Sequence, residues 1–175
     1  KEEEKEDFSI KKLETLINSS VERRLVSDVP LCILQSSGID STLVSYLASK
    51  INKNIETYTV GFRDNLFDES KDSKNISKFL GLVNHKINLE KKDLEEIIYN
   101  IPDAFDEPFA DSSQIPSMLI FKKISTHAKV CISGDGGDEV FYGYNRYQWY
   151  LIWQKLFKNN PLNNKIIEKM FSSSL

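Results

Sequence analysis

The chain has 175 residues, 40% of them hydrophobic, which is enough for one compact unit with a substantial core. Its formal net charge of −3 excludes a general attraction to nucleic acid, because binding to phosphate backbones needs a surplus of Lys and Arg. No apolar run approaches the roughly 20 residues that cross a bilayer, and no signal-peptide pattern opens the chain, so we expect a cytoplasmic protein that acts on small molecules.

Helical and strand-like segments alternate along the chain after a charged lead-in at residues 1–8. The helices predicted from apolar periodicity are 9–26, 41–50, 68–80, 93–105, 113–127, 144–157 and 163–171. The predicted strands are 31–34, 57–60, 84–89 and 129–133. Helices of this length between strands imply right-handed crossovers. The sequence therefore predicts an α/β fold over residues 9–175, a doubly wound parallel sheet with helices on both faces.

Single residues carry predictions about helix ends and the core. Ser9 and Asp68 are placed to cap helices, and Gly81 can end the third helix in a left-handed conformation. Cys32 and Cys131 each lie in a short apolar run, where a thiol behaves as a small hydrophobic group. We therefore expect both cysteines to pack in the core.

The most informative segment is LQSSGIDST at residues 34–42, where the first strand gives way to a helix. Small residues at such a turn can aim several backbone N–H groups at one point, and the helix dipole attracts anions. The hydroxyl donors that could assist are those of Ser36, Ser37, Ser41 and Thr42. A phosphate group is the expected ligand of this loop. A plain strand-to-helix turn capped by Asp40 or Ser41 is the alternative.

Acidic residues in two loops indicate a metal ion. The first loop matches neither a Walker loop nor a dinucleotide fingerprint. Since a carboxylate repels a polyphosphate unless a cation lies between them, Asp40 predicts a Mg²⁺ bridge. The second loop, SGDGGDE at residues 133–139, follows the fourth strand and offers Asp138 as another oxygen donor, although an ordinary glycine-rich turn would also explain it. Both loops lie at carboxyl ends of strands, where this topology binds nucleotides.

A third polar loop, FDEPFADSSQIP at residues 105–116, leads into a helix near the same edge, and Asp111 or Ser112 as a helix cap is its simpler explanation. Together, SSGIDST, TYTVGF, DEPFADSSQIP and SGDGGDEVFYGYNRY, in this order and spacing, resemble the synthetase domain of glutamine-hydrolysing (class B) asparagine synthetases. The similarity covers about residues 9–150.

The resemblance implies a PP-loop fold of the adenine nucleotide alpha hydrolase type, with ATP and Mg²⁺ as cofactors. It implies adenylation of the aspartate side-chain carboxylate, release of pyrophosphate, and displacement of AMP by ammonia from glutamine. It further implies an N-terminal glutaminase domain and C-terminal helices that this chain would lack as a fragment, and it allows a homodimer.

Matching motif positions also imply roles for single residues. The implied ATP and pyrophosphate contacts are Ser36, Ser37, Gly38, Asp40, Ser41 and Thr42, with Leu34, Val60, Ser133 and Gly134 at adenosine. The implied catalytic residues are Asp40, Asp135 and Asp138, of which Asp40 and Asp138 would share Mg²⁺. The implied neighbours of the substrate are Asp111, Ser112 and Gly136.

The chain departs from the family at Ser37, where the family usually has glycine. If the backbone there needs a positive φ, serine would be strained, and its side chain would narrow the phosphate site. Two other functions stay open: a related amidotransferase that acts on another carboxylate, and a non-catalytic nucleotide-binding module.

Overall fold

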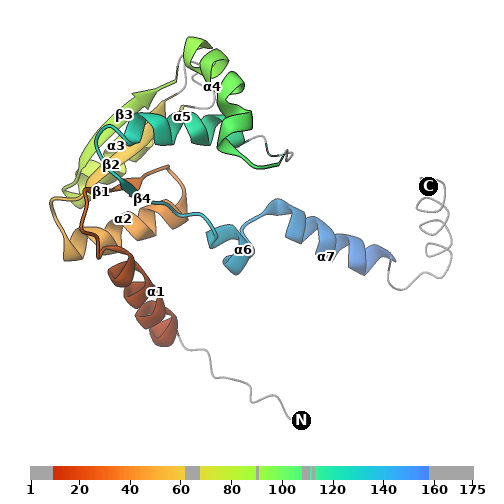
Figure 1. Ribbon diagram of the computed structural model, residues 1–175. Coiled ribbons are helices and arrows are strands. Elements are labelled where there is room, and N and C mark those ends of the chain that lie inside the picture. Colours follow the sequence, from red (N-terminus) through yellow and green to blue (C-terminus); the bar gives the residue numbers. More distant parts are fainter. Residues whose placement is uncertain (1–9, 62–67, 90, 108–110, 112, 158–175) are drawn as a thin grey trace, which may run out of the picture. The chain divides into compact units, whose positions relative to one another are not determined.

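The computed structural model describes residues 10–61, 68–89, 91–107, 111 and 113–157 (Figure 1). Its helices are α1 (Ile10–Arg24), α2 (Ile39–Ile51), α3 (Ser70–Leu80), α4 (Lys91–Ala104), α5 (Gln114–Ile124), α6 (Gly137–Phe141) and α7 (Asn145–Phe157). Its strands are β1 (Leu31–Leu34), β2 (Glu56–Gly61), β3 (Val83–Asn88) and β4 (Val130–Ile132). This order confirms the predicted alternation and adds the short helix α6. The predicted helix at 163–171 and the predicted cap Ser9 lie outside the described residues.

Packing divides the chain into two compact units, Lys1–Gly134 and Asp135–Leu175, where the sequence predicts one. The sheet and α1 to α5 belong to the first unit, and α6 and α7 belong to the second. The division falls inside the glycine-rich segment at 133–139, whose composition suggests a ligand loop rather than a boundary. The assignment of residues 9–175 to one ATP-binding domain stays a prediction. Within the described residues, no helix combines the length and apolarity needed to cross a membrane.

All four strands of the sheet are parallel, in the order β3-β2-β1-β4. The chain moves outward from β1 through β2 to β3, and then returns to the other side of β1 to add β4. The strand order therefore reverses between β1 and β4. In open α/β sheets, ligands bind outside the carboxyl ends of the strands at this kind of reversal. This strand order places the starts of the two predicted loops, at Gln35 after β1 and at Ser133 after β4, on either side of the reversal.

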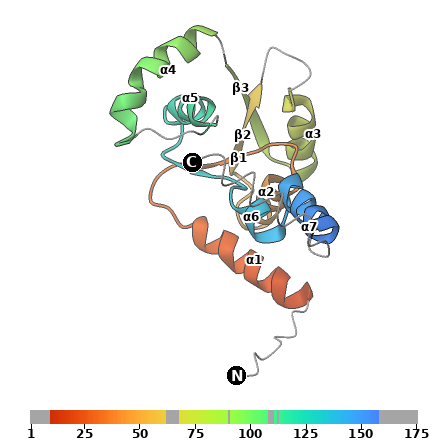
Figure 2. The ribbon, with the colours of Figure 1, turned by 90° about the vertical axis from the view of Figure 1, so that its right-hand side faces the viewer.

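Helices cover both faces of the sheet, as predicted, with α4 and α5 on one side and α2 and α3 on the other (Figure 2). Neighbouring residues of β1 supply both cores: Cys32 joins a cluster with residues of α4 and α5, and Ile33 joins one with residues of α1 and α2. Both side chains are at most 1% exposed, which explains the uninterrupted apolar run of this strand. Cys131 is half-buried against the Cys32 cluster, so both thiols pack in the core as expected.

Helix α3 ends and begins at defined residues. Gly81 adopts the predicted left-handed conformation with φ of 73°, and its N–H donates to the carbonyl of Lys78. At the other end, the N-cap position belongs to Glu69 rather than to Asp68. Asp68, one residue before the N-cap, still accepts a hydrogen bond at 3.1 Å from the backbone N–H of Ser70. It therefore stabilises the first turn of α3. The predicted cap is therefore displaced by one residue.

Candidate functional site

The loop after β1 turns directly into the N-terminus of α2. Gly38 is the N-cap residue, with φ of −70° and ψ of 156°, so the alternative that Asp40 or Ser41 caps the helix is wrong. Both residues lie inside the first turn, where backbone N–H groups have no acceptor within the helix. The N–H groups of Ile39, Asp40 and Ser41 are therefore available to an anion, and the helix dipole adds to the attraction.

Hydroxyl groups fold this loop back onto the first turn of α2. The Ser36 and Ser41 hydroxyls lie 2.8 Å apart, and Ser41 Oγ accepts from the backbone N–H of Ser36 at 3.1 Å. Thr42 Oγ1 donates to the carbonyl of Gly38 at 2.7 Å. These hydroxyls therefore shape the loop from within, and their direct contact with pyrophosphate stays a prediction.

The buried Gln35 connects the loop to the neighbouring helix and strand. The Gln35 side chain is 1% exposed; its Nε2 donates to the carbonyl of Ser36 at 2.6 Å, and its Oε1 accepts from the hydroxyl of Ser45 in α2. Its backbone N–H donates to Tyr58 of β2, and its carbonyl accepts from the hydroxyl of Thr59. Gln35 thus ties the loop to both α2 and β2. This role of Gln35 was not predicted from the sequence, although a polar residue directly after a buried strand indicates a special position.

Gly134, which follows β4, lies against the first turn of α2. A Cβ atom added to Gly134 would come within 2.7 Å of the backbone N of Ser41 and 3.1 Å of the Cβ of Asp40. Such distances leave no room for a side chain. Glycine is therefore required here for close approach between the loop after β4 and the available N–H groups of α2.

The other residues predicted at adenosine lie at the carboxyl ends of neighbouring strands. Leu34 ends β1, Val60 is the penultimate residue of β2, and Ser133 directly follows β4. Leu34 and Val60 are partly buried and pack against the same core cluster. The structure brings these residues to one edge of the sheet, while their contact with adenosine stays a prediction.

The remaining acidic candidates of the second loop belong to the second unit. Gly136 is the N-cap of α6 with φ of 91°, a conformation that favours glycine, and Asp138 lies in the first turn of this helix. The Asp138 carboxylate lies so close to Gly143 that a side chain at Gly143 would overlap it. Asp135 opens the unit and is exposed. Because Asp40 belongs to the first unit, the sharing of Mg²⁺ by Asp40 and Asp138 stays a prediction.

Asp111 lies in front of α5 with an ordered carboxylate. Its Oδ1 accepts from both the backbone N–H and the hydroxyl of Ser113, each at 2.8 Å, and these bonds lower the pKa of Asp111. Ser113 holds the N-cap position of α5, so the alternative of Asp111 as cap is displaced by two residues. Ser112 lies outside the described residues. The proximity of Asp111 to a substrate stays a prediction.

The backbone of Ser37 is not strained, although the family usually has glycine at this position. Among the described non-glycine residues, only Tyr142 has a positive φ. The Ser37 side chain is instead hydrogen-bonded to Glu69 of the α3 N-terminus: its hydroxyl donates to Glu69 Oε2 at 2.8 Å, and its backbone N–H donates to the same oxygen at 3.1 Å. Glu69 was not predicted from the sequence.

The N-terminus of α3 is fixed by an ion pair that makes a testable contribution to acid stability. Hydrogen bonds from Ser70, and then the one from Lys86 at 2.9 Å, lower the pKa of Asp68 to about 2. An unfolded chain releases this proton near pH 3.9, so between about pH 2 and 4 the unfolded state binds more protons, and stability rises with pH. The contribution is therefore complete above about pH 4 and is lost as the pH falls towards 2.

Urea unfolding from pH 5 to pH 2 measures this contribution. The wild-type chain should be more stable than Asp68→Asn at pH 5, and the difference should shrink steadily below pH 4. A difference that stays constant over this range would contradict the assignment.

Both histidines of the chain lie in a separate groove of about 660 Å³ between β3 and the helices α4 and α5. The rings of His85 and His127 stack on Tyr58, with centroid distances of 4.9 and 6.0 Å. In the described part of the chain, no three His, Cys, Asp or Glu side chains are grouped so that they could hold a metal ion. None of the residues that line the groove belongs to the loop after β1, so the groove is separate from that loop.

The chain is similar in sequence to proteins of a known family. Residues 12–175 match the family model described as Asparagine synthase. Asparagine synthetase [glutamine-hydrolyzing] 1 of Bacillus subtilis is 33% identical over 143 residues, which cover 82% of this chain and 23% of that protein. Asparagine synthetase [glutamine-hydrolyzing] of Zea mays is 31% identical over 147 residues, covering 75% and 24%. The chain thus spans about a quarter of the length of these relatives.

Solved structures show a similar fold at low identity. NMN synthetase from Francisella tularensis superposes with a TM-score of 0.54 and 17% identity, covering 79% of this chain and 59% of that one. The NH3-dependent NAD synthetase from Campylobacter jejuni gives a TM-score of 0.53 at 16% identity, covering 79% and 62%. These similarities agree with the predicted α/β fold.

Proposed function

Because the chain belongs to the asparagine synthase family, we propose that it forms the ATP-binding part of a glutamine-dependent asparagine synthetase. In this reaction, the side-chain carboxylate of aspartate attacks the α-phosphorus of ATP, pyrophosphate leaves, and ammonia from glutamine displaces AMP. The observation that carries the proposal is the approach of Gly134 to the first turn of α2, at the reversal of strand order. There, the N–H groups at the start of α2 lie beside Gly134, which has no side chain to block the approach of a phosphate.

The geometry suits the charge that develops in this reaction. Negative charge builds on the departing pyrophosphate, and the N–H groups of Ile39, Asp40 and Ser41 with the dipole of α2 can stabilise it. The internal hydroxyl network and the buried Gln35 hold these donors in place before the substrate binds. No side-chain nucleophile is needed, because the substrate carboxylate is the attacking group. The protein therefore mainly positions reactants and neutralises charge.

The loop also has the donor chemistry that Mg²⁺ prefers. The Asp40 carboxylate is half-buried in the first turn of α2, beside the N–H groups proposed for pyrophosphate. Oxygen ligands of this kind, together with phosphate oxygens, are the usual partners of Mg²⁺. When bound, the ion would neutralise charge on the phosphates. We propose Asp40 as one ligand of this ion.

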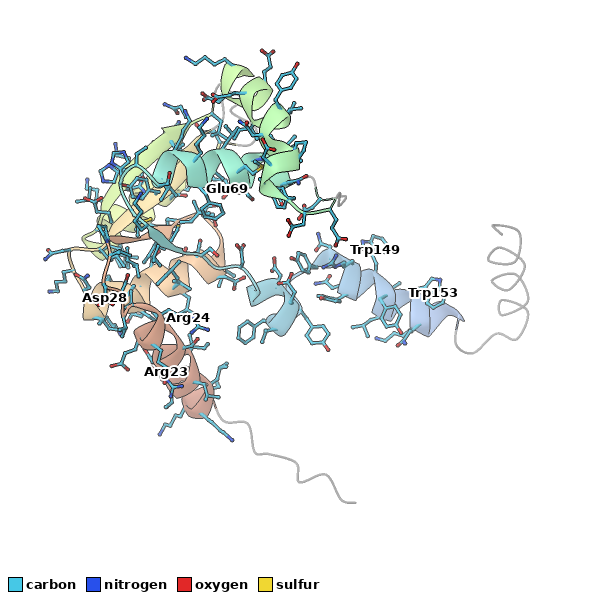
Figure 3. The ribbon with its side chains drawn as sticks, viewed as in Figure 1. Arg23, Arg24, Asp28, Glu69, Trp149 and Trp153 are labelled. Atoms are coloured by element: carbon cyan, nitrogen blue, oxygen red, sulfur yellow. The ribbon has the colours of Figure 1, made fainter. Side chains whose placement is uncertain are left out.

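Calorimetry with ATP tests the binding proposal. The chain should bind ATP in millimolar Mg²⁺, and Asp40→Asn should weaken this binding by at least the cost of losing an outer-shell metal partner, about tenfold. Asp28→Asn is the matched control, since it removes the same charge from an exposed residue ahead of β1 and should leave binding unchanged (Figure 3). Absence of ATP binding by the wild-type chain, or equal Mg²⁺ dependence in Asp40→Asn, would reject the assignment.

Pyrophosphate release separates an enzyme from a module that only binds nucleotide. With ATP, aspartate and ammonia supplied, a synthetase releases pyrophosphate, and a binding module releases none. Replacing aspartate with other carboxylates in the same assay separates asparagine synthesis from a related amidotransferase activity.

A further inference from the structure

A carboxylate already occupies part of the loop that we propose for phosphate. Glu69 Oε2 accepts two hydrogen bonds from Ser37, one from its hydroxyl at 2.8 Å and one from its backbone N–H at 3.1 Å. Ser37 directly precedes Gly38, the N-cap of α2. The donors that Glu69 takes are therefore next to the N–H groups at the start of α2, and a carboxylate oxygen satisfies them much as a phosphate oxygen would.

Contacts with β3 and α3 hold the backbone of Glu69 beside the loop. Asp68, next to it, is paired with Lys86 of β3 and accepts the N–H of Ser70. Lys86 reaches Asp68 by passing over Gly61, where any side chain would overlap the end of the lysine. The carbonyl of Glu69 accepts the N–H of Ser73 at 3.0 Å, which starts α3. The backbone of Glu69 is thus held by α3 and β3, while its exposed side chain is free to change rotamer.

Two negative groups cannot share these donors without a cost. A phosphate that enters the loop meets the Glu69 charge, and the two donors of Ser37 can serve only one of the two anions at a time. Resting on the proposed function, we propose that Glu69 is a resident anion of the phosphate loop, which competes with the phosphate groups of ATP and leaves Ser37 when they bind. Ser37 strengthens this competitor, because a glycine would offer Glu69 only the N–H group.

The proposal predicts that removing the Glu69 charge strengthens binding of phosphate ligands. Glu69→Gln keeps the size of the side chain and an oxygen acceptor for Ser37, but it removes the charge. Calorimetry with pyrophosphate in Mg²⁺, and with ATP in Mg²⁺, should give dissociation constants about tenfold lower than those of wild type, since hydrogen bonds to charged groups are about twice as strong as neutral ones. Adenosine, which has no phosphate, should bind equally to both proteins.

Asp72→Asn is the matched control, because Asp72 is an exposed acidic residue in the first turn of the same helix. It removes the same charge without touching Ser37, and it should change pyrophosphate binding little. Thermal unfolding of Glu69→Gln should match that of wild type, since the side chain is exposed.

The outcomes separate this proposal from the proposed function. If wild type binds ATP but Glu69→Gln binds pyrophosphate no more tightly, or more weakly, Glu69 is not a competitor. If adenosine affinity rises together with pyrophosphate affinity, or Asp72→Asn has the same effect, the competition is also overturned. If neither wild type nor Glu69→Gln binds ATP or pyrophosphate, the proposed function itself fails, and this inference fails with it.

Discussion

Replacing Gly134 with alanine is expected to remove ATP binding while leaving the chain folded. The added Cβ would lie 2.7 Å from the backbone N of Ser41 and 3.1 Å from the backbone C of Asp40, so the backbone of β4 or α2 has to move. Overpacking of this kind costs about 1–3 kcal/mol of stability. A shift of about 1 Å in positioned groups can lower a catalysed rate about 100-fold. The N–H groups displaced here are those proposed for pyrophosphate, so the affinity for ATP should fall strongly as well. Calorimetry with ATP in Mg²⁺ measures the loss.

Gly81→Ala is the matched control for a glycine outside the site. Gly81 has φ of 73°, so alanine is strained there, but nothing lies within 4 Å of the added Cβ. This variant should lose about 1 kcal/mol of stability and bind ATP as wild type does. If Gly134→Ala binds ATP with unchanged affinity, the approach of Gly134 to α2 is not the basis of the site.

Local patterns in the sequence were sufficient to predict most of the fold. The bounds of β1 agree with the prediction at both ends, because a short apolar run between Pro30 and a polar loop leaves little choice. Gly81 was recognised because a left-handed helix end strongly favours glycine. The parallel orientation of the strands followed from the helices between them, whereas their order in the sheet was not predicted.

Contacts between distant segments could not be predicted in this way. Ser37 and Glu69 are 32 residues apart, and no local pattern indicates that the N-terminus of α3 lies beside the loop after β1. The caps suggested for α2, α3 and α5 lie one to three residues from the observed N-cap positions, because several residues suited to capping stand close together at the start of each helix. The sequence therefore indicated the loop that we propose for phosphate, but not Glu69, which is hydrogen-bonded to it.

Substitution of Gln35 by leucine should cause the largest loss of stability among single changes near the loop. The Gln35 side chain is 1% exposed. It accepts a hydrogen bond from the hydroxyl of Ser45, which is fully buried. Leucine fills a similar volume but leaves the Ser45 hydroxyl without this acceptor and the Ser36 carbonyl without this donor. The buried Ser45 hydroxyl left unpaired costs about 1–3 kcal/mol. Ser36 is exposed and its carbonyl still accepts from the Ser41 hydroxyl, so losing its bond to Gln35 costs about 1 kcal/mol, and a total of about 3 kcal/mol is expected in urea unfolding.

The double variant Gln35→Leu, Ser45→Ala distinguishes a lost hydrogen bond from a general packing defect. When both partners become apolar, no hydroxyl is left unpaired, and the double variant should be less destabilised than the sum of the two single variants. ATP binding should be weaker than wild type in both Gln35→Leu and the double variant, because in each the Ser36 carbonyl has lost the side chain that holds the loop. Strict additivity of the two stability losses would show that the hydrogen bond between Ser45 and Gln35 Oε1 does not stabilise the chain, and the proposed role of that bond would be wrong.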